Sequence, residues 1–315
     1  MSVVARARVA ADDVLAGLLA NPKRLPCRLL YDEHGAQLFD QITQTEDYYP
    51  TRVELRLLDD CLPKIAAEVG VAARVIEPGS GAGIKTKRLL RALDQPASYI
   101  AIDVAREALD YSARVLRAEH PQLDVHTIVG DFTRSFALPA PRRLVGRTLV
   151  FFPGSTIGNF EPHDAVAFLG GLQRSAGANS RLVLGADGTR ELAVVERAYN
   201  DLEGVTADFN KNVLAHLNRA RNTNFDLDAF EHRAIWNERH SRIEMRLIST
   251  RDQQVDLDGT TIEIAVGEPI ITEYSYKHSL PAMRALLRAA GWQVREVFTG
   301  KEQPMRLWLC EPCGV

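Results

Sequence analysis

The feature that most constrains the fold of this chain is a glycine-rich turn between an apolar run and a helical pattern. The segment 75–86 reads Val-Ile-Glu-Pro-Gly-Ser-Gly-Ala-Gly-Ile-Lys-Thr. Glycines have no Cβ, so the backbone at Gly79 and Gly81 can turn sharply and approach a ligand closely. The helix that follows would point free N–H groups at the same place. Asp103 ends a second apolar run, 99–102, at the spacing of an acid that binds ribose hydroxyls. We therefore expect a cofactor that contains adenosine.

Two cofactors fit this turn, a nicotinamide dinucleotide and S-adenosylmethionine. The dinucleotide fingerprint is Gly-x-Gly-x-x-Gly. In this chain the third glycine, Gly83, comes one residue early. The spacing therefore favours S-adenosylmethionine.

Strand-like and helix-like patterns alternate after residue 50. The strand-like runs are 74–77, 99–103, 125–129, 147–152 and 181–186, and the helical patterns are 53–69, 85–94, 105–119 and 164–176. Such alternation predicts an α/β fold, with a parallel sheet that carries helices on both faces. Ligands bind at the carboxyl ends of such strands. Gly79, Asp103, Asp131 and the segment after Phe152 all lie at such ends.

The remainder of the chain predicts a second lobe. The sheet domain would span 52–188 and be completed by 279–315, with a helix at 281–290 and a hairpin of 294–298 with 305–309. The stretch 189–278 is too long for a simple crossover. It carries its own patterns, namely helices at 189–201 and 205–219 and strands at 242–248, 261–264 and 269–276. We expect it to form an inserted α+β lobe. The N-terminal segment 1–51, with a helix at 12–20, would pack on that lobe.

Composition excludes several classes of protein. The chain has 315 residues, 46% of them hydrophobic, and a formal net charge of −3. Nucleic-acid binders are usually basic, so a polyanionic partner is not expected. No apolar run approaches the roughly 20 residues of a membrane helix, and the polar start lacks an apolar signal core. These features predict a soluble, cytoplasmic protein without a membrane partner, and a monomer is the simplest assembly.

Cysteines and histidines give no metal signal. Cys310 and Cys313 have redox or zinc spacing, but zinc would need two more ligands nearby. The eight histidines show no ligand spacing. The acids of 224–232 lack the glycine and further oxygens of a calcium loop, so Asp226 or Asp228 is interpreted as a helix cap. We expect no metal.

Three polar or aromatic segments are candidate substrate contacts. Tyr48-Tyr49-Pro50 precedes a predicted helix. Its hydroxyls could bind a small polar ligand, or its rings could form a hydrophobic staple at the start of the helix. Asn159 lies in a glycine-rich loop after the strand 147–152. Its amide could bind a zwitterionic ligand, as donor and acceptor, or Asn159 could simply be a turn residue. In the strand 272–277, Glu273 and Ser275 share one face. They could hold two N–H groups of a ring such as imidazole, or merely face solvent on an edge strand.

Taken together, the motifs are specific. In order they are Tyr31-Asp32, the block 38–43, Tyr48-Tyr49-Pro50-Thr51-Arg52, Gly154-Ser155-Thr156-Ile157-Gly158-Asn159, the block 224–232 and Arg242-Ile243-Glu244-Met245. From about Pro26 to the C-terminus the chain resembles the L-histidine Nα-methyltransferase family of ergothioneine biosynthesis. The glycine loop departs most from that family, because Pro78 and Gly83-Ile84 make it less polar.

The resemblance implies a Rossmann-like class I methyltransferase sheet with a separate substrate lobe. It implies that S-adenosylmethionine methylates the α-amino group of L-histidine three times, giving hercynine and S-adenosyl-L-homocysteine. The implied cofactor residues are Gly79, Gly81, Lys85, Asp103 for the ribose, and Asp131 with Phe132 for the adenine. The implied substrate residues are Asn159 and Tyr199 at the carboxylate end, Glu273 and Ser275 at the imidazole, Met245 at the ring pocket, Tyr31 and Phe39 at the amino end, and Tyr48. Tyr31 and Tyr48 would position the amine for catalysis.

Three other functions remain open on sequence grounds. A sibling enzyme could methylate another amino acid such as tryptophan, although Glu273 would have little to bind on an indole. A nicotinamide-dependent oxidoreductase could use the same glycine loop. A regulatory protein could bind the cofactor without turnover.

Overall fold

The computed structural model describes residues 11–134, 136–300 and 304–314. The first ten residues of the predicted N-terminal segment lie outside this range. The chain divides into two compact units. The sheet unit comprises Tyr49–Arg190 and Tyr276–Val315, and the lobe comprises Met1–Tyr48 and Glu191–Ser275.

The sheet unit is built on a seven-stranded sheet of order β12-β13-β6-β5-β2-β3-β4. Its strands are β2 (Arg74–Pro78), β3 (Ser98–Asp103), β4 (Asp124–Val129), β5 (Thr148–Phe152), β6 (Ser180–Asp187), β12 (Trp292–Thr299) and β13 (Met305–Pro312). The strands from β6 to β4 pair in parallel. β13 adds to β6 in the antiparallel sense, and β12 adds to β13 in the same way. The predicted parallel sheet and its closing hairpin are both confirmed.

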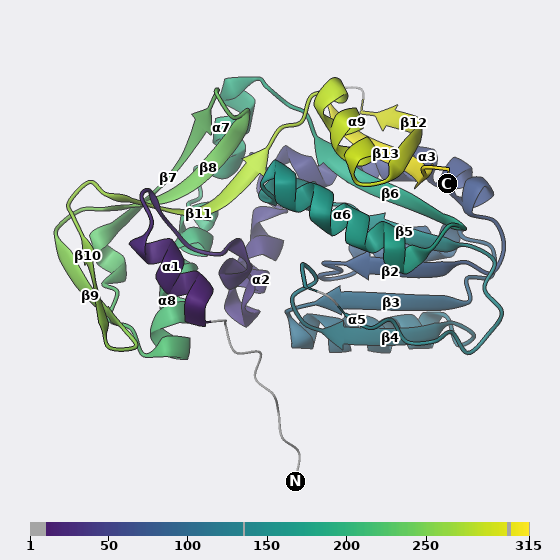
Figure 1. The fold of residues 1–315 in the computed structure, drawn as a ribbon, viewed down its shortest axis with the longest axis horizontal. Coiled ribbons are helices and arrows are strands. Elements are labelled where there is room, and N and C mark those ends of the chain that lie inside the picture. Colours follow the sequence, from purple (N-terminus) through teal and green to yellow (C-terminus); the bar gives the residue numbers. More distant parts are fainter. Residues whose placement is uncertain (1–10, 135, 301–303, 315) are drawn as a thin grey trace, which may run out of the picture. The chain divides into compact units, whose positions relative to one another are not determined.

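Helices cover this sheet on both faces. They are α3 (Tyr49–Val69), α4 (Ile84–Ala92), α5 (Arg106–Glu119), α6 (Pro162–Ala176) and α9 (Leu280–Ala289). Figure 1 shows α6 and α9 in front of the sheet, with α3 and α5 behind it. α9 begins where Ser279 accepts the N–H of Ala282 at 3.3 Å and ends before Gly291, whose φ is +82°. These are the helix boundaries that Pro281 and Gly291 predict.

The core of the sheet unit lies between the central strands and the helices α6 and α9. Val150 and Leu184 of the sheet pack in one cluster with Leu169 of α6 and Leu287 of α9, and all four are fully buried. Burying a side chain of this size contributes about 1.5–3 kcal/mol. This packing fixes the carboxyl ends of the parallel strands, where the predicted cofactor residues lie.

The lobe is built on a four-stranded sheet of order β1-β11-β8-β7, with a separate hairpin of β9 and β10. Its strands are β1 (Lys23–Arg24), β7 (Phe230–Asn237), β8 (Arg242–Ser249), β9 (Gln253–Leu257), β10 (Thr260–Ile264) and β11 (Pro269–Tyr276). Its helices are α1 (Ala11–Leu19), α2 (Glu33–Ile42), α7 (Leu192–Tyr199) and α8 (Val205–Arg221), with short 3-10 helices η1 (Cys27–Tyr31) and η3 (Leu227–Ala229). β1 pairs with β11 in parallel, so the early chain shares a sheet with residues some 250 positions later (Lys23 beside Ile270).

Several elements differ from the sequence-based expectations. α2, β7 and β9 were not predicted, and α7 is shorter than the predicted helix 189–201. Asp226 does act as a cap, since its side chain accepts the N–H of Asp228 at 3.1 Å. The helix it caps is only η3, and a strand follows. Cys310 and Cys313 are free thiols.

The described residues contain no helix with the length and hydropathy needed to cross a membrane. Nor do they bring together three or more His, Cys, Asp or Glu side chains as a metal site.

Candidate active site

The glycine loop of the sheet unit takes a backbone that side chains disfavour. Gly79, Gly81 and Gly83 have φ values of +68°, +49° and +72°. A Cβ built on Gly79 would lie 3.3 Å from the ring of Phe132. The loop therefore needs glycine at this position for both its conformation and its close approach to that ring.

Asp103 joins this loop to the end of β3. Its carboxylate is buried, with Oδ2 accepting the N–H of Gly81 at 2.9 Å and Oδ1 accepting the N–H of Ala105 at 3.0 Å. A carboxylate has about four lone-pair sites, so each oxygen can still accept a hydroxyl. The arrangement fits the predicted ribose contact, which stays a prediction.

Asp131 and Phe132 lie in the turn after β4. Asp131 Oδ1 accepts both the N–H and the hydroxyl of Thr133, at 2.9 and 2.5 Å. These bonds fix the turn that presents Phe132, whose ring meets Phe152 edge-on at 6.0 Å between centroids. An aromatic wall beside the glycine loop is the chemistry that an adenine ring needs.

Lys85 has a protein partner that the sequence analysis missed. It forms an ion pair with Glu54, a fully buried carboxylate on α3. Both oxygens of Glu54 also accept the N–H of Gly154, at 2.8 and 2.9 Å. Lys85 therefore neutralises a buried charge that holds the loop after β5, and its predicted contact with the cofactor stays a prediction.

Glu77, directly before Pro78 and the glycine loop, was also missed. Burial raises its pKa to about 7, against the opposing effect of hydrogen bonds from Thr86 (2.6 Å) and Tyr99 (2.7 Å) to Oε2. The sequence does hold a sign of this role: Glu77 follows the apolar residues of a buried strand, and a buried acid needs hydrogen-bond partners. It ties the start of the loop to α4 and β3.

In the lobe, β11 presents Glu273 and Ser275 on one face. Both are buried, at 8% and 3% exposed. Glu273 accepts a hydrogen bond from the Tyr31 hydroxyl at 3.2 Å, and Ser275 Oγ lies 2.7 Å from the Tyr199 hydroxyl. Burial and the nearby Glu273 carboxylate raise the pKa of Tyr31 well above its ordinary value, so Tyr31 keeps its proton. The two polar side chains are thus not solvent-facing, and each has a tyrosine beside it.

An aromatic cluster surrounds these polar groups. The ring of Phe39 meets Tyr31 at 5.6 Å, Tyr48 at 6.2 Å and Phe209 at 5.9 Å, measured between centroids. Tyr48 in turn meets Tyr199 edge-on at 6.1 Å. The rings come from five separate segments of the lobe. Phe209 of α8 belongs to the cluster, although no motif in the sequence pointed to it.

Met245 and Asn159 complete the predicted set. Met245 is buried on β8, beside β11, and its carbonyl lies 3.1 Å from the hydroxyl oxygen of Thr272. Asn159 belongs to the sheet unit, where it ends the 3-10 helix η2 (Thr156–Asn159). The roles predicted for both side chains stay predictions.

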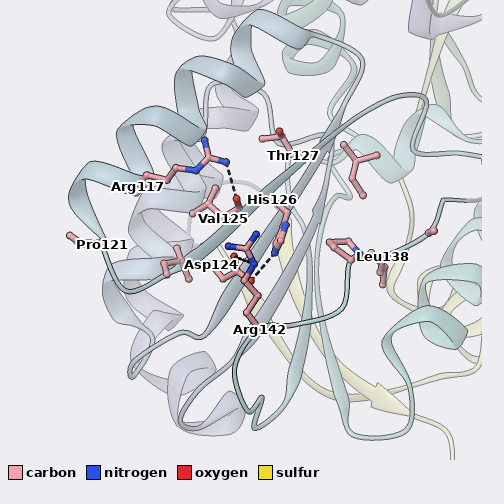
Figure 2. Close-up of a pocket in the computed structure, with 12 residues that line it drawn as sticks. Arg117, Pro121, Asp124, Val125, His126, Thr127, Leu138 and Arg142 are labelled. Atoms are coloured by element: carbon pink, nitrogen blue, oxygen red, sulfur yellow. Dashed lines mark hydrogen bonds and ion pairs between the residues drawn. The ribbon is translucent and has the colours of Figure 1, made fainter. Parts of the chain in front are cut away.

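A large pocket lies apart from all these residues, along the edge strand β4 of the sheet unit. It has a volume of about 770 Å³. The ionisable side chains drawn in Figure 2 have protein partners: His126 lies 2.8 Å from Asp124, Arg142 lies 3.9 Å from the same carboxylate, and Arg117 donates to the Val125 carbonyl at 2.8 Å. None of the predicted site residues lines it, so its size alone assigns it no role.

Comparison with known proteins identifies the family. A family model described as histidine-specific methyltransferase, SAM-dependent, matches residues 10–312. The chain belongs to this methyltransferase family. It is 41% identical to "Histidine N-alpha-methyltransferase" of Mycolicibacterium smegmatis, over 89% of this chain and 87% of the relative. It is 40% identical to the protein of the same name from Mycobacterium tuberculosis, again over 89% and 87%.

A solved structure supports the methyltransferase fold. An S-adenosylmethionine-dependent methyltransferase from Clostridium acetobutylicum matches with a TM-score of 0.50 and 10% identity, covering 89% of this chain and 98% of that one. At such identity the likeness concerns the fold alone. The predicted family and the class I methyltransferase fold are confirmed, and the nicotinamide alternative falls because the family depends on S-adenosylmethionine.

Proposed function

We propose that this methyltransferase transfers methyl groups from S-adenosylmethionine to the α-amino group of L-histidine, three times, to give hercynine in ergothioneine biosynthesis. The observation that carries the choice of substrate is the pair of buried side chains Glu273 and Ser275 on one face of β11. A carboxylate and a hydroxyl side by side suit the two N–H groups of an imidazole ring. An indole offers such a site a single donor.

The residues of the glycine loop fit S-adenosylmethionine. Gly79 lacks the side chain that would crowd Phe132, and Asp103 keeps acceptor capacity on both oxygens. We propose that Gly79, Gly81 and Asp103 hold the methyl donor, with Asp131 and Phe132 beside the adenine. When bound, this donor supplies a methyl group already activated on a sulfonium, and S-adenosyl-L-homocysteine is left.

The chain's own task is then to bind and align the amine. An unperturbed α-amino group has a pKa near 8, so a useful fraction is neutral at working pH and no strong base is required. Tyr31 keeps its proton, which it donates to Glu273, and can orient the amine through its oxygen. Tyr48, Phe39 and Tyr199 wall the site, which excludes water from the reacting nitrogen. Alignment of this kind is where most of the rate enhancement must come from.

Repeated methylation requires anchors that do not change between rounds. In the proposal the imidazole rests on Glu273 and Ser275, and the carboxylate on Tyr199 and Asn159. Neither group of histidine is altered when the amine gains a methyl. Each product can therefore bind again in the same place until the nitrogen has no proton left to lose.

The test is mass spectrometry of L-histidine incubated with the protein and S-adenosylmethionine, with L-tryptophan as the parallel substrate. Three added methyl groups on histidine, and none on tryptophan, are the expected result. Methylation of tryptophan or another amino acid, but not histidine, would contradict the choice of substrate. No methylation of any amino acid, with tight binding of S-adenosyl-L-homocysteine, would instead point to a regulatory protein.

The remaining parts of the proposal are a monomeric, cytoplasmic protein that uses no metal and binds no nucleic acid. The lobe, with the N-terminal segment, would be the substrate-binding part. Light scattering of the purified protein, with and without S-adenosyl-L-homocysteine, tests the monomer, and a dimer mass would contradict it.

A further inference from the structure

The end of α7, which carries Tyr199, is held by the edge strand of the lobe sheet. Figure 1 shows α7 alongside β7 and β8. The Asn200 side chain accepts the N–H of Ala234 at 2.8 Å and donates to the Ala234 carbonyl at 3.0 Å. β7 is an edge strand, so these backbone groups are available to a side chain. This two-way bond fixes the residue after Tyr199.

His232 makes the second attachment. It lies two residues before Ala234 on β7. Its Nε2 is 2.8 Å from the carbonyl of Tyr199, and its Nδ1 is 2.8 Å from Nδ2 of Asn210 on α8. Both ring nitrogens are thus engaged.

The hydrogen bonds fix the state of the ring. Nδ2 of Asn210 also lies 3.1 Å from the Arg246 carbonyl, which can only accept. That atom must therefore be the amide nitrogen, and Nδ1 of His232 must accept from it. The ring proton then sits on Nε2 and is donated to Tyr199. The contact at Nε2 gives the same tautomer by a separate argument, because the Tyr199 carbonyl can only accept a hydrogen bond and Nε2 must therefore carry the proton.

The same amide reaches the strand that carries the proposed imidazole site. Oδ1 of Asn210 accepts the hydroxyl of Thr272 at 2.5 Å, one residue before Glu273 on β11. Asn210 and Thr272 are buried, at 0% and 1% exposed. One chain of hydrogen bonds therefore runs from the backbone of Tyr199, through the part-buried His232 and the buried Asn210, to β11.

We propose that His232 is a positioning residue for the substrate site: as the neutral Nε2–H tautomer, set by Asn210, it fixes the backbone of Tyr199 and so keeps the Tyr199 hydroxyl at Ser275. This inference rests on the proposed function, in which Tyr199 anchors histidine. The residue acts through Tyr199 and touches no reacting atom.

The electrostatics of His232 agree with a neutral ring. Burial lowers its pKa, and Lys211 adds to this, against the opposing effects of the Tyr199 carbonyl and Asp201. Below that pKa a proton on Nδ1 would face the N–H of Asn210, with two donors opposed. The KM for histidine should therefore rise as pH falls through the lowered pKa.

Two variants separate the two contacts of the ring. His232→Gln places an amide nitrogen near the position of Nε2 and keeps the donor to Tyr199. His232→Asn keeps a group near Nδ1 for Asn210 but does not reach Tyr199. Loss of a hydrogen bond to this part-buried carbonyl corresponds to a loss of about tenfold. We expect His232→Asn to raise the KM for histidine about tenfold, with the KM for S-adenosylmethionine unchanged, and His232→Gln to stay within about threefold of wild type.

Asn218→Ala is the matched control for general loosening of the lobe. Asn218 also lies on α8 and bonds the backbone of Phe225 twice, at 2.8 and 2.9 Å, but it has no link to Tyr199. It should lower the melting temperature and leave the KM for histidine unchanged. A folded His232→Asn with wild-type KM, or an equal rise in KM for Asn218→Ala, would overturn the positioning role.

NMR of ¹⁵N-labelled histidine side chains tests the tautomer without any turnover. The signal assigned to His232, by its loss in His232→Gln, should show a neutral Nε2–H ring at pH 6. A protonated or Nδ1–H ring would refute the inference even if histidine is methylated. Conversely, failure of wild-type protein to methylate histidine would count against the proposed function, while the tautomer would still be judged by NMR.

Discussion

The sheet unit contains a buried ion pair whose removal should be costly. Lys277 Nζ lies 3.0 Å from Asp187 Oδ2, and both side chains are 0% exposed. Asp187 also accepts hydrogen bonds from the hydroxyl of Tyr49 and from Thr189, through its hydroxyl at 2.6 Å and its N–H at 2.9 Å. Lys277→Met keeps the apolar stem and removes only the ammonium, so the buried carboxylate of Asp187 loses its ion-pair partner.

The expected loss follows from this geometry. Breaking a buried pair by removing one partner costs about 3–5 kcal/mol, because the other charge stays buried. An exposed pair is worth about 0–1 kcal/mol. Lys64→Met is therefore the matched control, since Lys64 is 58% exposed and contacts Glu296 at 2.6 Å. Changing Asp187→Asn together with Lys277→Met should recover part of the loss, because no buried charge then remains.

The pH dependence supplies a second check. Burial alone would raise the pKa of Asp187, but Lys277, with the hydrogen bonds of Thr189 and Tyr49, holds it below its ordinary value. A lowered pKa in the folded state adds stability above the unfolded pKa of about 3.9 and loses it as pH falls through the folded pKa. In Lys277→Met the ammonium no longer opposes the effect of burial, which raises the pKa of Asp187. The loss of unfolding free energy relative to wild type should therefore be largest at pH 7 and shrink towards pH 4.

Urea unfolding followed by tryptophan fluorescence measures both effects. The reasoning is refuted if Lys277→Met unfolds within about 1 kcal/mol of wild type at pH 7, as Lys64→Met should. It is also refuted if the deficit grows on acidification. In either case the pair would not carry the energy that its burial implies.

The ion pair of Asp187 and Lys277 lies where the chain enters and leaves the sheet unit. The chain crosses between its two units after Tyr48, after Arg190 and after Ser275. Tyr49, Thr189 and Lys277, each within two residues of one crossing, all contact Asp187. One carboxylate therefore ties together the three points at which the chain enters or leaves the sheet unit.

Three further predictions concern the site. Glu273→Gln should raise the KM for histidine by about 10- to 100-fold, the worth of a charge-assisted hydrogen bond, and a collapse of kcat with unchanged KM in steady-state kinetics would contradict the anchoring role. Gly79→Ala should weaken binding of S-adenosyl-L-homocysteine in calorimetry, because φ is +68° and a Cβ would lie 3.3 Å from Phe132, whereas Gly70→Ala, at φ +78° with open space around it, should leave that binding unchanged. Dialysis against EDTA should leave methylation unchanged, and a loss restored by one metal would reveal a metal site that the sequence does not predict.

Local patterns predicted the sheet unit well for a physical reason. A strand buried on both faces is a short apolar run, and glycine at positive φ marks the turn that follows it, so both signals lie within a few residues. The lobe was predicted less well. β7 reads Phe-Glu-His-Arg-Ala-Ile-Trp-Asn and is an edge strand. Its polar and apolar residues are mixed, so it lacks the short apolar run by which a buried strand is predicted.

Partners far apart in sequence explain the side chains that were missed or assigned only in part. The family resemblance assigned Lys85 to the cofactor, yet its ion-pair partner Glu54 lies 31 residues upstream. His232 is the last residue of the motif 224–232, in which only the acids were given a role. Its contacts are to Asn210 and Tyr199, 22 and 33 residues away. A buried polar group must find partners wherever the fold brings them. Its type therefore indicates that partners exist, and only the tertiary structure says which residues they are.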